Sequence, residues 1–194
     1  LNDLEVMSAD VQNAFLNAPC KEKVWIVAGP EFGPEQGKHL IIVRALYGLK
    51  SASASFRAFM ANHLDDLGFK STMADPDVWL KPAVKSDGKE YYEYILMYVD
   101  DILAVSVDAK SILMKIKASV KFKNDKIEVP SNYLGAKLKK KNINGQECWS
   151  ITSLDYIKTA METVEEGLRH RAGKLPTKVA TPMMNNFILY TSDT

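Results

Sequence analysis

Residues 91–107 read YYEYILMYVDDILAVSV, two β-prone and mostly apolar runs that are joined at an acidic pair. The first run covers 91–99 and the second 102–107, and each has the length and composition of a strand. Asp100 and Asp101 stand between the runs, so the pattern predicts a tight hairpin with both carboxylates at its tip. Acids in loops usually have polar neighbours, and the apolar flanks make this pair unusual.

Helices and further strands are predicted on both sides of this hairpin. Upstream we expect a strand at 4–11 that ends near Asp10, and two short strands at 24–27 and 40–43 around a Gly/Pro-rich connection at 29–37. A helix at 53–67 that Gly68 ends, a turn at 75–77 and a strand starting at 78–80 should follow. Downstream we expect a helix at 108–121 capped by Asp108, a hairpin of 133–141 and 147–151 around Asn144-Gly145, a helix from Ser153 to about Val164 ended by Gly167, and an irregular tail from Arg169 with a break at Thr181-Pro182.

The order of these elements predicts the fold class. Without an inserted hairpin at about 17–50, the order is strand, helix, strand, strand, helix, strand, which is the ferredoxin-like βαββαβ pattern of an α+β fold with an antiparallel sheet. In that topology the strand after Asp101 lies antiparallel beside the first strand. Asp10 and the Asp100-Asp101 pair, 90 residues apart in the sequence, should therefore meet at one sheet edge.

Composition excludes several classes of protein. The chain has 194 residues (21.7 kDa), 46% of them hydrophobic and 25% charged, which is typical of one folded domain or slightly more and too apolar for disorder. The apolar runs are too short to span a membrane, and no membrane partner is expected. Cys20 and Cys148 alone form neither a disulfide framework nor a zinc site, which favours a reducing compartment. The first residues, LNDLE, contain neither a targeting signal nor an initiator Met, so we expect an internal fragment of a longer protein.

The net charge of +1 conceals a strong asymmetry. Residues 1–79 carry 7 basic and 10 acidic side chains, whereas residues 109–141 carry 10 lysines against Asp125 and Glu128. An acidic first half followed by a lysine block suggests a metal-binding centre beside a track for a polyanion. From charge alone, a solvated helix face and a lysine-protected hairpin edge are the more common explanation.

Three converging carboxylates also have a chemical meaning. Asp10, Asp100 and Asp101 would repel one another unless cations lie between them. Hard oxygen ligands without neighbouring His or Cys suit Mg²⁺, and two such ions can stabilise both oxygens of an in-line phosphoryl displacement. The alternative is structural: a strand end and a polar turn.

Several motifs resemble those of a known family. Tyr98-Val99-Asp100-Asp101 resembles the Tyr-x-Asp-Asp signature of reverse transcriptases, and DVQNAFL at 10–16 resembles the preceding motif of copia-type LTR retrotransposons. Further matches in the same order and spacing are LYGLK at 46–50, LGF at 67–69, ADPD at 74–77 and YLG at 133–135, with weaker traces at 156–157 and 181–182. The similarity runs from about residue 5 to residue 160, and the chain resembles the reverse transcriptase domain of a copia-type Pol polyprotein.

This resemblance implies an organisation and an activity. Residues 1–130 would be the polymerase palm with a fingers insertion at about 17–50, and residues 131–194 a primer-grip-like hairpin and the start of a helical thumb. The N-terminal fingers and RNase H would lie outside the fragment. The implied activity is RNA-directed DNA synthesis from dNTPs on an RNA or DNA template-primer, with two Mg²⁺ (or Mn²⁺) ions and the remainder of the Pol polyprotein as partner. The implied location is intracellular, in a cytoplasmic virus-like particle or the nucleus. We expect the isolated fragment to have weak or no activity, and the oligomeric state stays open.

The resemblance also implies roles for individual residues. The catalytic acids would be Asp10, Asp100 and Asp101, with the Val11 carbonyl as a further metal ligand. The residues implied at the nucleotide are Asn13, Ala14, Phe15 (which would exclude a 2′-hydroxyl), Tyr47, Gly48 and Lys50. Those implied at the primer–template are Tyr98, Tyr133, Leu134, Gly135 and Lys137, and Lys139–Lys141 would continue a track along the nucleic-acid backbone. The general acid would be Lys121, Lys123 or Lys126. Structural roles are the alternatives for three of them: a core aromatic for Phe15, a turn glycine for Gly48 and a strand residue for Tyr133.

One departure and two alternatives stay open. After Lys50 the family usually has Gln-Ala-Pro-Arg, whereas this chain has SASA at 51–54, which leaves template positioning undecided. A non-catalytic nucleic-acid-binding remnant of a decayed retrotransposon is the first alternative. The second is another two-metal phosphotransferase such as a nucleotide cyclase, which does not explain Phe15 or the YLG hairpin. His39, His63 and His170 form no metal-binding pattern.

Overall fold

The structure is a computed structural model that describes residues 3–170 and Gly173. The predicted break at Thr181-Pro182 and most of the predicted irregular tail lie outside the described residues. The chain divides into two compact units, Leu1–Ile151 and Thr152–Thr194. The first unit contains the predicted carboxylate edge.

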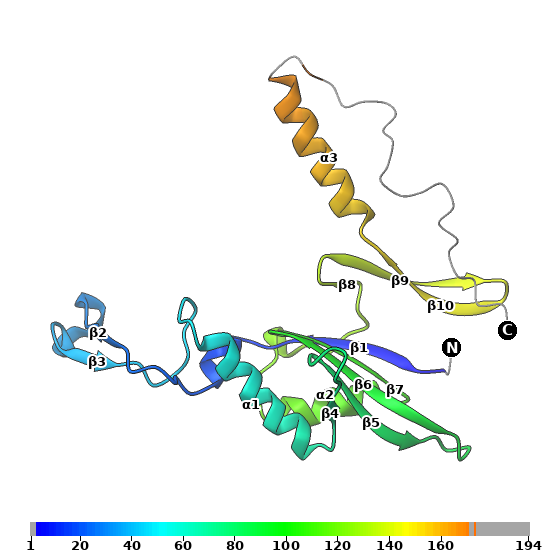
Figure 1. Cartoon of the computed structure of the whole chain (residues 1–194), viewed down its shortest axis with the longest axis horizontal. Helices are drawn as coiled ribbons and strands as arrows, with labels where there is room; N and C mark the ends of the chain where they lie inside the picture. Colours follow the sequence, from blue (N-terminus) through cyan, green and yellow to red (C-terminus); the bar gives the residue numbers. More distant parts are fainter. Residues whose placement is uncertain (1–2, 171–172, 174–194) are drawn as a thin grey trace. The chain divides into compact units, whose positions relative to one another are not determined.

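A five-stranded antiparallel sheet forms the centre of the first unit (Figure 1). Its strands, in spatial order, are β1 (Glu5–Asp10), β7 (Asp101–Ser106), β6 (Glu90–Tyr98), β5 (Val78–Val84) and β4 (Lys70–Ser71). β1 pairs with β7 as predicted, and β4 is a short addition that the sequence did not indicate. The mixed α and β composition with antiparallel sheets agrees with the predicted fold class.

Two helices supply most of the remaining core. α1 (Ala52–Asp66) buries Phe56, Met60 and Leu64 at four-residue intervals, and α2 (Ala109–Lys117) buries the apolar positions of its own inner face. Alternate positions of the strands join this core: Ala9, Trp79, Ile95, Met97, Ile102 and Ala104. Because strand side chains alternate between faces, the even-numbered residues of β1, including Asp10, lie on the opposite face of the sheet.

The ends of the helices follow the predicted signals in part. Gly68 has a φ of +86°, which ends α1 as expected. Asp108 accepts the backbone N–H of Ser111 on Oδ1 at 2.9 Å and caps α2. α2 nevertheless ends at Lys117 rather than near residue 121. Hydrogen-bonded turns continue to the buried Val120, whose N–H donates to the Ile116 carbonyl at 3.2 Å. The chain then becomes extended at Phe122, which is also buried and bridges to Val11.

The last strand of the ferredoxin-like pattern does not join the main sheet, and this part of the prediction is wrong. Among the described residues, the outer edge of β1 pairs through two isolated bridges, Ser8 with Glu128 and Val11 with Phe122. Pro130 follows two residues after Glu128 and has no N–H to continue a ladder. A separate sheet then forms in the order β10-β9-β8, from β8 (Asn132–Tyr133), β9 (Ala136–Ile143) and β10 (Gln146–Thr152).

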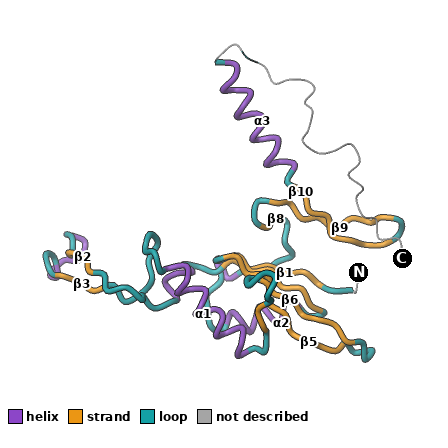
Figure 2. The backbone as a smooth tube through the Cα atoms, viewed as in Figure 1, coloured by secondary structure: helices purple, strands orange, loops and turns teal. Residues whose placement is uncertain are grey.

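The predicted hairpin turns are present. Asn144 and Gly145 have φ angles of +53° and +85°, which suit the two-residue turn between β9 and β10. The predicted early hairpin is formed by β2 (Trp25–Val27) and β3 (His39–Ile41), and its connection contains 3-10 turns at Pro30–Glu35 (Figure 2).

The second unit contains α3 (Leu154–Arg169). This helix continues past both Val164 and Gly167, so the prediction that Gly167 ends it is wrong. A glycine within a helix costs only about 1 kcal/mol relative to alanine, which the rest of the helix tolerates. Within the described residues, no helix combines the length and apolarity needed to cross a membrane.

Candidate active site at the carboxylate edge

The predicted convergence of the acids is present in the structure. Asp10 is the last residue of β1 and Asp101 the first of β7, and the two are register partners across the β1–β7 ladder. The carbonyl of Asp100 accepts the backbone N–H of Val11 at 2.7 Å. The strand end and the hairpin are thus held together by backbone hydrogen bonds, which place the three acids at one sheet edge.

The turn itself is one residue earlier than predicted. Tyr98 and Asp101 are register partners, so Val99 and Asp100 form the two-residue loop between β6 and β7. Asp101 therefore belongs to a strand rather than to the tip. Val99 has a φ of +53°, a left-handed conformation that is rare for a β-branched residue. Such strain costs about 1–3 kcal/mol and is concentrated at functional sites.

The acids influence one another electrostatically. Burial raises the pKa of Asp101, and the neighbouring charges of Asp100 and Asp10 raise it further, while Lys123 acts in the opposite direction. Lys123 Nζ lies 3.1 Å from Asp10 Oδ2, and this contact raises the pKa of the ammonium. The site thus concentrates negative charge beside a lysine that stays protonated.

A cleft of about 290 Å³ opens beside the acids. Its lining comes from β1, β7, the segment after α2 and β8: Ser8, Ala9, Asp10, Asp101, Ile102, Lys123, Asn124, Lys126, Glu128, Asn132 and Tyr133. Burial raises the pKa of Tyr133 to about 12, and the charges of Asp101, Asp77 and Asp75 add to this. The phenol therefore remains a hydrogen-bond donor over the physiological range of pH.

Sequence reasoning missed some of this lining. Ser8 stands two residues before Asp10 on the same face of β1, and the alternation of side chains along a strand was a signal that could have identified it. No sequence pattern could have identified Asn132 and Glu128, because they line the cleft as a result of the path that the chain takes after α2.

The chemistry of the donors fits a divalent metal ion. Carboxylate oxygens and a backbone carbonyl are the ligands that Mg²⁺ prefers. In the described part of the chain, no three His, Cys, Asp or Glu side chains are arranged as a formed metal-binding group. The cation that contacts Asp10 in this conformation is the Lys123 ammonium.

The residues implied at the nucleotide are only partly brought together. Asn13, with a φ of +50°, precedes a 3-10 turn at Ala14–Asn17 whose first residue is fully buried. The ring of Phe15 lies 4.5 Å from that of Tyr47 and 6.3 Å from that of Phe56, between centroids. Phe15 thus packs against the core and also contacts the exposed ring of Tyr47.

The segment where the chain departs from the family makes structural contacts. Glu22 Oε1 accepts the backbone N–H of Ser51 at 2.8 Å and its hydroxyl at 2.5 Å. These hydrogen bonds lower the pKa of Glu22. Ser51 therefore ties the start of α1 to the segment before β2. Gly48, with a φ of +97°, adopts a backbone conformation that favours glycine, and Lys50 is exposed.

Three of the residues implied at the primer, Tyr133, Leu134 and Gly135, lie at a second turn. Leu134 and Gly135, with φ angles of +47° and +77°, join β8 to β9, while Tyr133 pairs with Ala136. Lys137 lies opposite Asn132 on β9. Tyr98 is exposed at the end of β6.

The three general-acid candidates are placed differently. Lys123 contacts Asp10, whereas Lys126 pairs with Glu128 at 2.5 Å. Lys121 accepts the backbone N–H of Gln12 on its carbonyl, and its side chain is exposed. Lys123 is thus the candidate that contacts a predicted catalytic acid.

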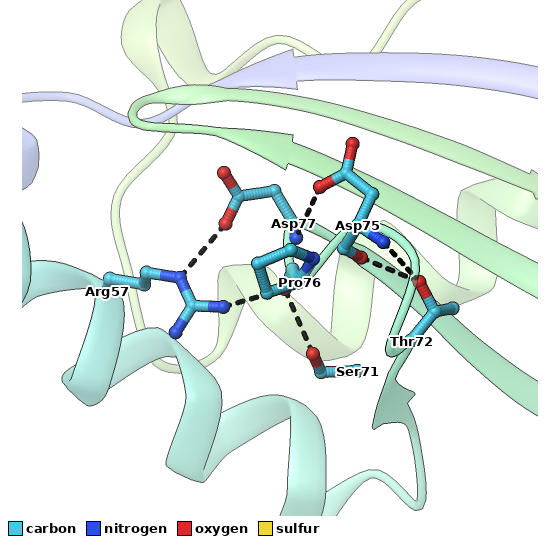
Figure 3. Close-up of polar contacts among 6 residues, drawn as sticks. All are labelled: Arg57, Ser71, Thr72, Asp75, Pro76 and Asp77. Carbon is cyan, nitrogen blue, oxygen red and sulfur yellow. Dashed lines mark hydrogen bonds and ion pairs between the residues drawn. The ribbon is translucent and has the colours of Figure 1, made fainter.

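The sequence also gave no indication of an ion pair beside the strained turn (Figure 3). Arg57 of α1 donates from Nε to Asp77 Oδ1 at 2.9 Å and from Nη2 to the Pro76 carbonyl at 2.7 Å. The carbonyl of Asp77 in turn accepts the N–H of Met97 at 3.0 Å. A cavity of about 240 Å³ separates these groups from the loop and is lined by Ser53, Phe56, Arg57, Asp77, Met97, Tyr98 and Val99. No spacing rule pairs residues 20 positions apart in different elements.

An antiparallel sheet that gathers three acids beside a lysine-rich segment is an arrangement suited to metal-assisted phosphoryl transfer. Residues 2–175 match the family model described as reverse transcriptase (RNA-dependent DNA polymerase), and the chain belongs to that family. The predicted family is therefore confirmed.

Curated relatives point the same way. The chain is 29% identical over 120 residues to the retrovirus-related Pol polyprotein from transposon TNT 1-94 of Nicotiana tabacum, which covers 61% of this chain and 9% of that protein. It is 30% identical over 105 residues to the corresponding polyprotein from transposon RE1 of Arabidopsis thaliana, which covers 53% of this chain and 7% of that protein. The chain thus spans less than a tenth of the length of these relatives. Both relatives are Pol polyproteins of plant transposons, in agreement with the family match.

Proposed function

We propose that this chain is the polymerase region of a retrotransposon reverse transcriptase, in which a primer 3′-hydroxyl attacks the α-phosphorus of a dNTP and pyrophosphate leaves. The observation that carries the proposal is the register pairing of Asp10 with Asp101, with Asp100 in the adjoining turn. This pairing occurs in a chain that belongs to the reverse transcriptase family. Carboxylates far apart in sequence are thereby brought together, where they could hold the divalent cations that assist phosphoryl transfer.

Each acid has its own part in this proposal. Asp10, Asp100 and the carbonyl of Val11 would hold two Mg²⁺ ions, or Mn²⁺ in their place, and Asp101 would add negative charge. When bound, these ions supply Lewis-acid stabilisation of the attacking and leaving oxygens. The protein orients its carboxylates through the β1–β7 ladder and the Val11–Asp100 hydrogen bond.

The surrounding residues would bind the nucleotide and the nucleic acid. Phe15 and Tyr47, which are in ring contact, would lie at the sugar, together with the backbone of Asn13 and Ala14, while Gly48 and Lys50 would lie along the template side. Tyr98, the Tyr133-Leu134-Gly135 turn and Lys137 would position the primer. Lys123 or Lys126 would donate a proton to the leaving pyrophosphate.

The proposed organisation follows from these roles. Residues 1–130 would form the palm with a fingers insertion at about 17–50, and residues 131–194 the primer-grip-like hairpin and the start of the thumb. The relatives are Pol polyproteins, which supports the remainder of such a polyprotein as partner. The site of action would be intracellular, in a virus-like particle or the nucleus.

The test is template-directed incorporation of dTTP on poly(rA)–oligo(dT) with Mg²⁺. It uses this chain and, in parallel, the longest natural polypeptide that contains these residues. We expect weak or no incorporation by the chain itself and clear incorporation by the longer polypeptide, which Asp100→Asn abolishes. Asp66→Asn removes an exposed carboxylate at the end of α1 and is the matched control. Incorporation that survives Asp100→Asn would refute the assignment.

A further inference from the structure

The contact between Lys123 and Asp10 is the starting point. Lys123 Nζ lies 3.1 Å from Asp10 Oδ2, the side chain of Lys123 is 64% exposed and that of Asp10 36%. The ammonium therefore occupies a position next to the carboxylate that a bound cation would use. Lys126, three residues further along, also lines the cleft but pairs with Glu128 instead.

The backbone that carries Lys123 is firmly held. Phe122, the preceding residue, is buried and bridges to Val11 beside Asp10. Two residues after Lys123, the side chain of Asp125 pairs with Lys117 of α2 at 2.8 Å. The Cα of Lys123 is thus anchored at the carboxylate edge, while its four-carbon side chain is exposed and has room to turn away. This combination allows the ammonium to leave Asp10 without a rearrangement of the fold.

We propose that Lys123 is an intrinsic counter-ion of the metal site, which neutralises Asp10 in the metal-free protein and must be displaced when a divalent cation binds. The inference rests on the proposed function, because Asp10 is the ligand for which the two cations compete. An ammonium and a divalent ion on the same carboxylate repel each other strongly. Displacement therefore lowers the apparent affinity for the metal and keeps the cluster of acids partly neutralised until the metal arrives.

The same displacement distinguishes Lys123 from its neighbour. Once separated from Asp10, its ammonium remains tethered at the rim of the cleft, where the phosphates of a substrate would lie. Lys126 pairs with Glu128 rather than with Asp10 in the metal-free protein, so metal binding at Asp10 would not release it. Metal binding would thus free this particular lysine to contact the substrate.

The test measures metal affinity rather than catalysis. MgCl₂ is titrated by calorimetry, and MnCl₂ by electron paramagnetic resonance, into the 194-residue chain without nucleotide or nucleic acid. We expect Lys123→Met to bind both ions about fivefold more tightly than the parent chain. Lys126→Met removes the same charge from the same cleft and should change the affinity by less than about twofold. Lys123→Arg keeps a cation on Asp10 and should stay close to the parent.

Several outcomes would overturn the inference. Equal or weaker binding by Lys123→Met, or the same gain in Lys126→Met, would show that Lys123 does not compete with the metal. Absence of binding in all variants would do so as well. If the longer polypeptide still incorporates dTTP in an Asp100-dependent manner, only the counter-ion inference has failed. Loss of both metal binding and incorporation would reject the proposed function too.

Discussion

Two acidic regions of the first unit differ in how their carboxylates are satisfied. In the turn at 75–77, Asp75 Oδ1 accepts the N–H of Asp77 at 2.9 Å, and Asp77 is paired with Arg57 (Figure 3). At the carboxylate edge, Asp10 is in contact with Lys123, while burial and the neighbouring acids raise the pKa of Asp101. In the first region both carboxylates accept hydrogen bonds from neighbouring groups. In the second, Asp100 and Asp10 repel the charge of the partly buried Asp101, and Lys123 acts against that repulsion.

This difference separates a structural from a functional use of the same residue type. Acids whose charges are compensated within the fold stabilise it, and their removal should lower stability. Acids that repel one another beside a strained backbone destabilise the fold, so their presence indicates a role in function rather than in stability. Four substitutions test this comparison, and they follow from the largest to the smallest expected effect.

The largest effect is expected for Asp100→Asn. It should lower dTTP incorporation by the longer polypeptide by at least about 1,000-fold, since the amide cannot replace a charged ligand at the proposed metal site. The melting temperature of the metal-free chain should change by less than about 2 °C. Parallel primer extension and thermal unfolding check both. A large fall in stability with residual incorporation would make Asp100 a structural acid like Asp77.

Arg57→Ala should mainly lower the stability of the fold, whereas Asp100→Asn should mainly lower incorporation. It removes the guanidinium from Asp77 and from the Pro76 carbonyl, and we expect a loss of about 1–2 kcal/mol in the free energy of unfolding. The melting temperature should fall by about 3–6 °C, as measured by circular dichroism. Lys70→Ala, which removes an exposed ion pair with Asp65, is the control and should have a smaller effect. Equal effects of the two substitutions would show that the Arg57 pair has no special structural weight.

Asp101→Asn should stabilise the metal-free chain while reducing incorporation. Burial and like charges raise the pKa of Asp101 above its ordinary value of 3.8, so the folded state binds the proton more tightly than the unfolded state. The ionised carboxylate therefore costs stability above its folded-state pKa, and this cost disappears as the pH falls through that value towards 3.8. We expect a gain of about 2 °C at pH 7 that shrinks towards pH 4. A pH series of melting curves would detect it, and a loss of stability at pH 7 would contradict the repulsion described for this edge.

The smallest effect is expected for Val99→Asn. Asparagine accepts the left-handed conformation that Val99 adopts with its φ of +53°, so the substitution should relieve part of the strain. The melting temperature should rise by about 1 °C. Val105→Asn, in the extended strand β7, is the matched control and should lower it. If Val99→Asn destabilises the chain to the same extent, the turn stores no strain.

Part of this site was predictable from the sequence. The two apolar runs around Asp100 and Asp101 predicted adjoining strands, and the element order predicted that Asp10 would lie beside them. Both predictions depend on local periodicity and on the few ways in which a short antiparallel sheet can be connected. The implied roles of the other residues, from Asn13 to Lys137, remain predictions.

Other features could not be read from the sequence. Strand register moved the turn to Val99-Asp100, and Pro130 ended the pairing along β1, so the Tyr133 segment joined a separate sheet. The residue types at the turn do not dictate the strand register by themselves, and a proline does not dictate which sheet the following segment joins. Phe122 bridges to Val11 in an extended conformation, whereas the local periodicity had predicted a helix up to Lys121.

The sequence by itself determined the family, the strands around the acidic pair and the meeting of three acids at one sheet edge, because these depend on short motifs and on periodicity that neighbouring residues share. Only the tertiary structure decided that Lys123, rather than Lys121 or Lys126, contacts Asp10, and that Arg57 pairs with Asp77. Those contacts join side chains from different elements. Their geometry depends on how the whole core packs, and no local pattern of residues encodes it.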